Sequence, residues 1–233
     1  AGARRARFQG GEPTVRRDLG DLLADAHDVG YVATTIFTNA RMAASRAGAK
    51  WLTDMRPTWF QVSIQGGTAE AHDASVCAPG AFVQTVKGTR RLLAEGQRVK
   101  INVVLTRHAT ETLPELATLL CDLQPEEVGF DTVKPSAAFG ATRASYRELV
   151  PTFASFAPAL ASALRRLQES GVEARVTSFP ACISAEIQPF VSEELGTTQT
   201  MGSDGLVVLK RKWKWGNQVK TDVCTRCAYD EIC

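Results

Sequence analysis

Hydrophobic and polar positions follow two different spacings along the chain. Runs of mostly apolar residues, such as YVATTIF and INVVL, are rich in β-branched side chains and predict strands that are covered on both faces. Between these runs, apolar residues recur every three or four positions, which predicts helices. The strands are expected at Arg4–Gln9, Tyr31–Phe37, Trp59–Ile64, Val99–Leu105, Val128–Val133 and Val172–Thr177. The helices are expected at Arg17–Val29, Met42–Met55, Phe82–Glu95, Leu113–Leu123 and Leu149–Glu169.

The alternation of strands and helices predicts an α/β fold with a parallel sheet. The number of repeats favours a partial or full (β/α) barrel over an open sheet. After Phe179 prolines and glycines interrupt the pattern, and the segment LVVLKRKWKW predicts a short hairpin. We therefore expect two domains, a partial TIM-like barrel at residues 1–179 and a small cysteine-rich appendage at residues 180–233.

The composition is that of a globular protein, and it argues against membrane-spanning proteins and against proteins that bind nucleic acids or anionic membranes through bulk charge. Hydrophobic residues make up 44% and charged residues 22% of the 233 residues, so a sizeable core can form. The formal net charge of +2 gives no reason to expect a nucleic acid or an anionic membrane as partner. No apolar run approaches the roughly 20 residues that span a bilayer, and no signal peptide is visible. Three of the six cysteines fall in the last ten residues, which is typical of a reduced, metal-binding, cytoplasmic protein.

The segment FQGGEPT places two glycines, an acid and a proline at the end of the first expected strand. Parallel α/β folds bind ligands at the carboxyl ends of their strands. The backbone of Gly10 and Gly11 can approach a ligand closely because it carries no side chains. Glu12 offers a carboxylate to a ligand ammonium group, and Pro13 suits the first turn of a following helix. Taken alone, the segment is better explained as an ordinary tight turn between strand and helix, with the acid as a cap.

Five segments in order extend this motif. They are FQGGEPTVRRDL, IFTNAR, VSIQG, AHDASVCAPGAFVQTVKG and INVVLT. Together they resemble, in the same order, segments of the radical S-adenosylmethionine (radical SAM) enzymes. The resemblance covers Ala6 to Val133 most closely and favours the branch with a C-terminal auxiliary-cluster domain of the twitch or SPASM type. It implies a barrel that binds SAM and a [4Fe-4S] cluster, and an electron donor such as flavodoxin or ferredoxin. It further implies a 5′-deoxyadenosyl radical that abstracts hydrogen from a peptide or small-molecule substrate.

The same resemblance implies roles for individual residues. Gly10, Gly11 and Glu12, with Pro13, would hold the amino group of the cofactor. Ser63 and, on the next strand, Asn102 would contact its ribose or carboxylate, and Thr38 and Asn39 would lie nearby. For Ser63 and Asn102 a structural role at the strand ends is the alternative.

The sequence departs from the family pattern at several positions. No CxxxCxxC motif, which holds the catalytic cluster in the family, occurs in the 233 residues. Either the chain starts after that segment or it is a degenerate relative, and the apolar edge left by a missing first strand favours the former. We therefore expect that this polypeptide alone does not perform the radical step. Ala40 stands where the family usually has glycine, and Gln65 stands where Asp or His is common. Cys77, expected to be buried, replaces an arginine that can contact the cofactor carboxylate.

The cysteine-rich tail predicts a metal site. Cys224, Cys227 and Cys233 form a C-x2-C-x5-C pattern, and Cys182 is the natural fourth ligand. Four thiolates suit a [4Fe-4S] cluster or a structural zinc ion, and the resemblance favours the cluster. The KRKWKWG segment at 210–216 could contact a peptide or nucleic acid, although a solvent-facing hairpin is the preferred interpretation. Two other functions stay open, a zinc-stabilised binding module without enzymatic activity and a radical enzyme that acts on RNA.

Overall fold

The computed structural model describes residues 3–133, 143–180, 182–192, 199–201, 207–209, 220 and 222–227. Within these residues a parallel sheet of six strands follows the chain order from β1 to β6, and each strand pairs with the next in parallel. The strands are β1 Arg5–Phe8, β2 Ala33–Thr38, β3 Trp59–Ser63, β4 Val99–Val104, β5 Glu127–Asp131 and β6 Glu173–Thr177. A separate antiparallel pair is formed by β7 Gln199–Met201 and β8 Val207–Leu209.

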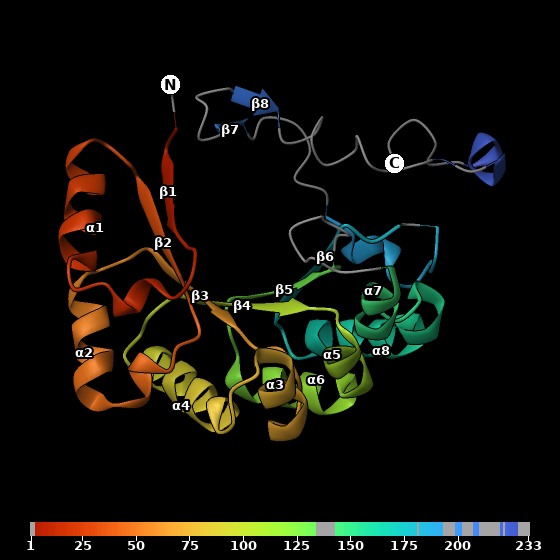
Figure 1. Ribbon diagram of the computed structural model, residues 1–233, viewed down its shortest axis with the longest axis horizontal. Coiled ribbons are helices and arrows are strands. Elements are labelled where there is room, and N and C mark those ends of the chain that lie inside the picture. The colour runs from red at the N-terminus through yellow and green to blue at the C-terminus, as the bar shows by residue number, and fades with distance from the viewer. Residues whose placement is uncertain are drawn as a thin grey trace.

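Helices connect the parallel strands. They are α1 Leu19–Asp28, α2 Arg46–Asp54, α3 Ala69–Val76, α4 Ala81–Ala94, α5 Arg107–Glu111, α6 Leu113–Leu123, α7 Arg143–Leu149 and α8 Phe153–Glu169. Short 3-10 helices lie at η1 Pro13–Val15, η2 Met42–Ala44, η4 Gln188–Phe190 and η5 Asp222–Arg226. The sheet curves from β1 to β6 with the helices on its outer side, so that the fold is a partial barrel (Figure 1). The predicted α/β class and partial-barrel architecture are confirmed.

The hydrophobic core lies between the sheet and the helices. Alternate residues of the central strands, such as Phe60, Ile101 and Phe130, are fully or almost fully buried against helix residues that include Leu116 and Leu160. The intervening strand residues face the inner side of the curved sheet, and most of them are polar and half-buried. The inner face is therefore where polar chemistry can take place.

The two edges of the sheet differ. On the β6 side, Val176 forms an isolated parallel bridge with Val191, and the Ser192 N–H donates to the Val176 carbonyl at 2.9 Å. On the β1 side, no described strand pairs with the outer edge. The sheet is thus an open barrel in the part of the chain that the structure describes.

Two predicted helices differ from the structure, one divided and the other shortened at its start. The helix predicted at Met42–Met55 splits into η2 and α2 because Ser45 is extended, and its hydroxyl accepts the Gly48 N–H at 3.0 Å as the N-cap of α2. The helix predicted at Leu149–Glu169 starts later, as α8 at Phe153, because Pro151 follows and the residue before a proline is disfavoured in helical conformation; the preceding α7 was not predicted. Sequence analysis missed α3, whose small and polar residues show little apolar periodicity.

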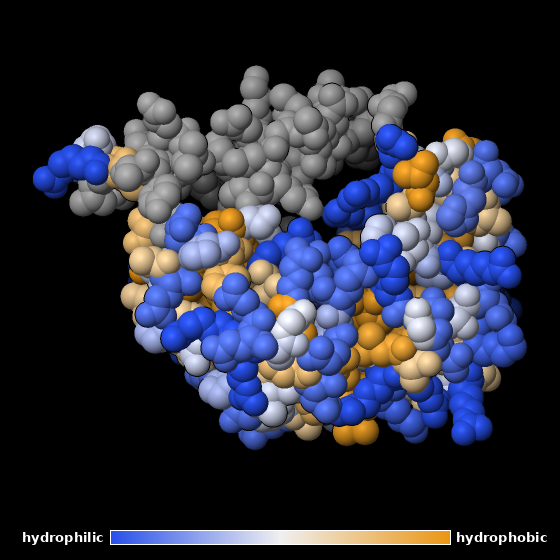
Figure 2. Space-filling model, turned by 180° about the vertical axis from the view of Figure 1, so that it is seen from behind, coloured by the Kyte–Doolittle hydropathy of each residue, from blue (hydrophilic) through white to orange (hydrophobic). Residues whose placement is uncertain are grey.

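Some predictions fall on residues that the structure does not describe. They include Cys233 and the KRKWKWG segment, so the hairpin predicted there stays a prediction. The predicted domain boundary at 179/180 also stays a prediction. No helix of the described residues has the length and apolar character to cross a bilayer. The side of the molecule seen in Figure 2 carries mainly hydrophilic side chains, with smaller hydrophobic areas between them.

Candidate functional site

Two glycines at the carboxyl end of β1 leave open space above their backbone. Gly10 and Gly11 have φ values of 99° and 52°, a region that favours glycine. A Cβ atom built on either residue would have no other atom within 4 Å. Among the described residues, no hydrogen bond occupies their backbone N–H or C=O groups. These peptide groups are therefore available to a ligand.

The Glu12 carboxylate links the ends of β1 and β2. Its Oε1 accepts hydrogen bonds from the Thr14 N–H at 3.2 Å, the Thr14 hydroxyl at 2.8 Å and the Thr38 hydroxyl at 2.8 Å. Its Oε2 accepts the Asn39 N–H at 2.7 Å. Each carboxylate oxygen has about two lone-pair positions, so the three donors crowd Oε1, whereas Oε2 has one donor and keeps a position for a further one. The predicted contact with a ligand ammonium stays a prediction, because the geometry shows only the internal partners.

The turn after β2 is built from the other predicted residues. The Thr38 hydroxyl also accepts the Ala40 N–H at 3.0 Å, and the Asn39 side-chain oxygen accepts the Arg41 N–H at 2.9 Å. Ala40 has a φ of 58°, in the left-handed region that glycine adopts more readily than other residues. Pro13 is buried and begins η1. Thr38, Asn39 and Pro13 thus support the site structurally.

Helix α4 packs directly on this turn. A Cβ atom at Gly88 would collide with the Ala40 carbonyl oxygen and lie 3.2 Å from the Ala44 nitrogen. The Thr85 hydroxyl donates to the Asn39 carbonyl at 2.9 Å. The absence of a side chain at Gly88 is therefore needed for α4 to hold the turn beside Glu12.

Ser63 and Asn102 lie side by side because they pair in the register of β3 and β4, and their contact with a cofactor stays a prediction. The Asn102 side-chain oxygen accepts the Gln61 amide at 3.5 Å, which is a weak contact. Gln65, where Asp or His was expected, accepts the Val104 N–H at 2.8 Å through its side-chain oxygen. The Gln65 side chain therefore ties the loop after β3 to the end of β4.

The His72–Asp73 pair organises the connection from β3 to α4. His72 is buried, and its Nδ1 accepts the Gln65 N–H at 3.0 Å. Burial lowers the pKa of His72, and the nearby Asp73 charge raises it by less. The neutral ring is therefore favoured. Asp73 accepts the Phe82 N–H at 2.7 Å and the Gly80 N–H at 2.5 Å, and the first of these hydrogen bonds is the main cause of its lowered pKa. Sequence analysis did not identify this capping role.

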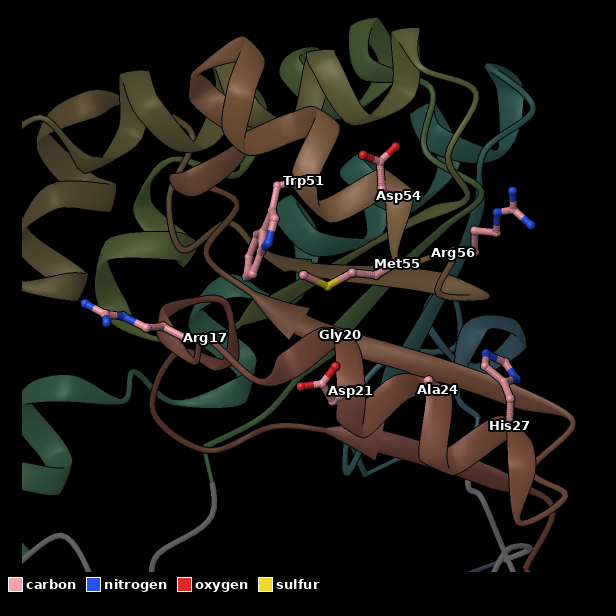
Figure 3. Close-up of a pocket in the computed structure, with 9 residues that line it drawn as sticks. All are labelled: Arg17, Gly20, Asp21, Ala24, His27, Trp51, Asp54, Met55 and Arg56. Atoms are coloured by element: carbon pink, nitrogen blue, oxygen red, sulfur yellow. The ribbon is translucent and has the colours of Figure 1, made fainter.

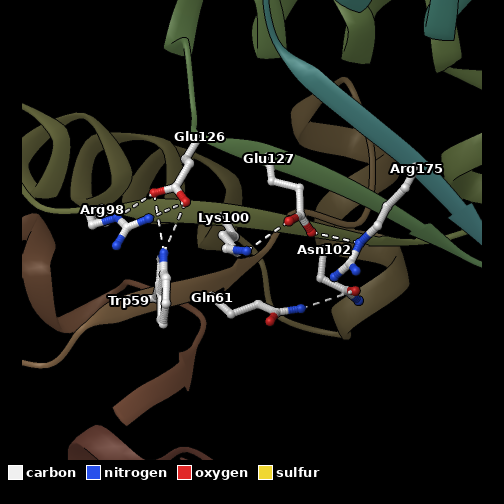
Figure 4. Close-up of polar contacts among 8 residues, drawn as sticks. All are labelled: Trp59, Gln61, Arg98, Lys100, Asn102, Glu126, Glu127 and Arg175. Carbon is white, nitrogen blue, oxygen red and sulfur yellow. Dashed lines mark hydrogen bonds and ion pairs between the residues drawn. The ribbon is translucent and has the colours of Figure 1, made fainter. Parts of the chain in front are cut away.

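Charged residues line the inner face nearer to the amino ends of the strands than the glycine turn (Figure 4). Arg98 donates two hydrogen bonds of 2.7 Å to Glu126, which lowers the pKa of that carboxyl group, and its guanidinium lies 4.3 Å from the Trp59 ring centroid. Glu127 has only 7% of its surface exposed and lies between two cations. Its partners are Lys100 at 2.7 Å and Arg175 at 2.7 Å. Sequence analysis missed this network, although the alternation in VKINVV and EARVT was a usable signal.

The described cysteines do not form a complete metal site. Cys224 and Cys227 lie on one turn, where the Cys227 N–H donates to the Cys224 carbonyl at 3.0 Å. Cys182 is exposed. Within the described residues, no three side chains of metal-ligating type lie together, and the four-cysteine site stays a prediction because Cys233 is not described. The prediction that Cys77 is buried is wrong, since this residue is exposed at the left-handed end of α3.

A groove of about 710 Å³ lies between α1 and α2 (Figure 3). Trp51, Met55 and Gly20 form its centre, and charged residues such as Arg17 and Asp54 form its rim. Its walls belong to the outer helical layer. None of the predicted cofactor residues lines it, so it is a feature separate from the strand ends.

Comparison with known proteins adds independent information. A sequence profile of the family described as "Radical SAM superfamily" matches residues 1–120, just over half of the chain. Mycofactocin maturase MftC of Mycobacterium ulcerans (strain Agy99) is 37% identical over 150 residues, which are 62% of this chain and 38% of that protein. The chain therefore spans well under half of this relative's length.

Two solved structures share the fold. Native anSMEcpe with bound AdoMet and Kp18Cys peptide has a TM-score of 0.67 at 16% identity, and the match covers 98% of this chain and 74% of that chain. Streptococcus suis SuiB bound to precursor peptide SuiA has a TM-score of 0.55 at 16% identity, covering 74% of this chain and 38% of that chain. At these identities the likeness establishes the architecture.

Proposed function

Because the chain belongs to the radical SAM superfamily, we propose that it binds SAM at the carboxyl ends of β1 to β4 and serves the radical modification of a peptide. The observation that carries the proposal is the open backbone of Gly10 and Gly11 beside the hydrogen-bonded Glu12. A ligand there would lie at the carboxyl ends of parallel strands, where such folds bind ligands.

The residues present fit the cofactor. The peptide groups of Gly10 and Gly11 would receive its amino group, and the Glu12 carboxylate would position them by joining β1 to the turn after β2. Ser63 and Asn102, paired in register, would present a hydroxyl and an amide to its ribose or carboxylate. Once bound there and given one electron by a [4Fe-4S] cluster, the cofactor would release methionine and supply the chemistry that abstracts hydrogen from the substrate.

A peptide is the substrate class that the comparisons favour. MftC is named a maturase, and the SuiB and anSMEcpe structures are described with bound peptides. We propose by analogy that the inner face of this sheet receives a peptide. An electron donor such as flavodoxin or ferredoxin would serve the reduction.

We also propose that Cys182, Cys224, Cys227 and Cys233 hold an auxiliary [4Fe-4S] cluster. The support is the location of Cys224 and Cys227 on one turn, from which two thiolates can bind one metal centre. A structural zinc ion is the alternative at the same residues. Since the 233 residues contain no CxxxCxxC motif, we expect this chain alone to bind SAM without forming 5′-deoxyadenosine under strong reductant.

The SAM site can be tested with a pair of matched glycines. Gly10 has a φ of 99° and Gly30 a φ of 96°, and a Cβ atom at either would have open space. Gly10→Ala and Gly30→Ala should therefore cost similar stability, about 1–2 kcal/mol, but only Gly10 lies at the proposed site. Equilibrium dialysis with labelled SAM should give a dissociation constant of about 1 mM or lower for the unaltered chain.

The two variants should then separate. We expect Gly10→Ala to weaken SAM binding at least about fivefold, or roughly 1 kcal/mol, and Gly30→Ala to leave it unchanged. Equal SAM affinity in all three proteins, or no SAM binding by the unaltered chain, would contradict the proposed site.

A further inference from the structure

Helix α4 exposes apolar side chains in the outer helical layer (Figure 1). Its buried side, which includes Thr85 and Gly88, packs on η2 and on the turn after β2. On the side away from these contacts, Val83 has 63% of its surface exposed, and Phe82 and Val86 next to it are half-buried. The solvent side of a surface helix ordinarily carries polar residues. The apolar residues of α4 therefore need a reason other than the packing of this chain.

A groove of about 530 Å³ follows this side of α4. Three apolar and three cationic side chains line it, namely Phe82, Val83, Val86, Lys87, Arg90 and Arg91, and we call it the α4 groove. No acidic side chain is among the described residues that line it. Along the helix the apolar residues come first and the cations follow. The α4 groove therefore has an apolar half and a basic half.

The positive charge of the groove is only partly balanced within the described part of the chain. Arg90 forms an ion pair with Asp122 at 2.6 Å. Arg91 donates to the Ala44 carbonyl at 2.6 Å, a neutral acceptor that leaves its charge uncompensated. Lys87 is exposed and has no hydrogen bond or ion pair with the residues that the structure describes. Two positive charges thus stand beside the apolar half. The dipole of α4 favours cations near its end, but it gives no reason for an exposed valine beside them.

The order of the two halves argues against a second copy of this chain as the occupant. Two α4 helices related by a two-fold axis would run antiparallel, so the apolar half of one would meet the basic half of the other. Two parallel copies would place cations opposite cations. A flat anionic membrane would meet the cations, but it would leave the concave surface beside them unfilled. A partner with carboxylates next to apolar side chains complements both halves.

We propose that the α4 groove binds an acidic amphipathic helix of a partner protein. The apolar residues of that helix pack on Val83 and Val86, and its carboxylates pair with Lys87 and Arg91. Recognition of this kind uses apolar anchors spaced three or four residues apart along a helix, and the charges set the choice of partner and the rate of association. The inference does not depend on the proposed function, because the α4 groove contains none of the residues assigned to SAM.

Three fluorescein-labelled peptides of about 18 residues, or about five helical turns, serve as probes. The first carries leucine on one helical face and glutamate on the other. The second has lysine in place of glutamate, and the third has the composition of the first in an order without an apolar face. Binding to the full chain is measured by fluorescence anisotropy at low and high salt. The first probe should bind with a dissociation constant of about 100 μM or lower, and the other two at least about tenfold more weakly. Salt should weaken the binding of the first probe because it screens exposed charges.

Two pairs of variants assign the binding to the groove. Val83→Ser should weaken the first probe about fivefold because it removes apolar contact area, whereas the control Val29→Ser alters an exposed valine at the end of α1 and should have no effect. Lys87→Glu should weaken the same probe at least about threefold and reduce the salt dependence. Its control, Lys50→Glu, changes the net charge equally at an exposed lysine of α2 outside the groove and should retain the affinity.

Several outcomes would overturn the inference. They are equal binding of the three probes, no binding at all, and a loss in the controls as large as in Val83→Ser and Lys87→Glu. Binding to vesicles of phosphatidylglycerol and phosphatidylcholine that exceeds binding of the first probe and is lost in both groove variants would make the groove a membrane contact. Self-association in sedimentation that is lost in Val83→Ser would make it a contact between copies. SAM affinity should be equal in Val83→Ser and the unaltered chain, so the groove and the SAM site stand or fall separately.

Discussion

Replacing Glu12 with glutamine tests whether its carboxylate holds the strand ends together. The carboxylate accepts two backbone N–H groups, from Thr14 and Asn39, and two threonine hydroxyls. A glutamine has one accepting oxygen and one donating NH₂ group. If its oxygen faces Asn39, the NH₂ group opposes the Thr14 N–H. If the amide is turned, the NH₂ group opposes the Asn39 N–H instead.

Either orientation leaves one backbone donor without its acceptor. The threonine hydroxyls can rotate and accept from the NH₂ group, so their hydrogen bonds persist in a weaker, uncharged form. Thr14 has only 2% of its surface exposed, so water does not readily replace the lost partner on that side. Losing one hydrogen bond to a charged acceptor corresponds to about 2 kcal/mol of unfolding free energy. For a chain of this size the melting temperature should fall by about 4–8 °C.

The assay is urea unfolding followed by circular dichroism, with Glu115→Gln as the control because Glu115 is exposed on α6. The control should change the unfolding free energy by less than about 0.5 kcal/mol. Combining Glu12→Gln with Thr38→Val should give a coupling energy of at least about 0.5 kcal/mol, since the two side chains share a hydrogen bond. An unchanged stability in Glu12→Gln together with weaker SAM binding would refute the reasoning and show that the carboxylate faces the ligand.

Three further predictions follow from the same contacts. Gly88→Ala should destabilise the protein by about 1–3 kcal/mol in urea unfolding, because its methyl group meets the Ala40 carbonyl. The control Gly20→Ala should be neutral or stabilising, because the nearest neighbour of its methyl group would be 3.8 Å away. Equal effects of the two substitutions would contradict the packing argument. The lowered pKa of Asp73 means that its stabilising contribution is present above the unfolded pKa of about 3.9 and is lost as the pH falls through the lower folded value. The urea midpoint of Asp73→Asn should therefore lie below that of the unaltered chain at pH 7, and the gap should narrow as the pH falls below about 3.9. A gap independent of pH would count against the charged cap. Reconstitution without oxygen should yield about four iron and four sulfide per chain, lost in Cys224→Ser, whereas one zinc and no sulfide would favour the structural-clip alternative.

Local patterns were sufficient to predict most of the barrel. The strand and helix periods of segments such as INVVL and LATLLCDL depend on neighbours a few residues away, so the sequence shows them directly. The same holds for FQGGEPT, whose glycines adopt the left-handed conformations that such a turn requires. Helix breaks at Ser45 and Pro151 were also encoded locally, although the apolar periodicity on either side concealed them.

The partners of the polar groups were decided only by the tertiary structure. Glu12 was assigned to a ligand from its place in the motif, yet its hydrogen bonds include Thr38 and Asn39, which lie 26 and 27 residues away in sequence. Glu127 likewise meets Lys100, 27 residues before it, and Arg175 on the next strand. Such pairs depend on the register between strands, which no single segment specifies.

The sequence by itself therefore determined the class of fold, the order of its elements and the glycine turn on which the family resemblance rests. The tertiary structure decided which inward side chains meet across β3 to β6 and which acids are already occupied by internal donors. The physical reason is that periodicity records burial one residue at a time, whereas hydrogen bonds and ion pairs require two specific side chains to be brought together by chain packing.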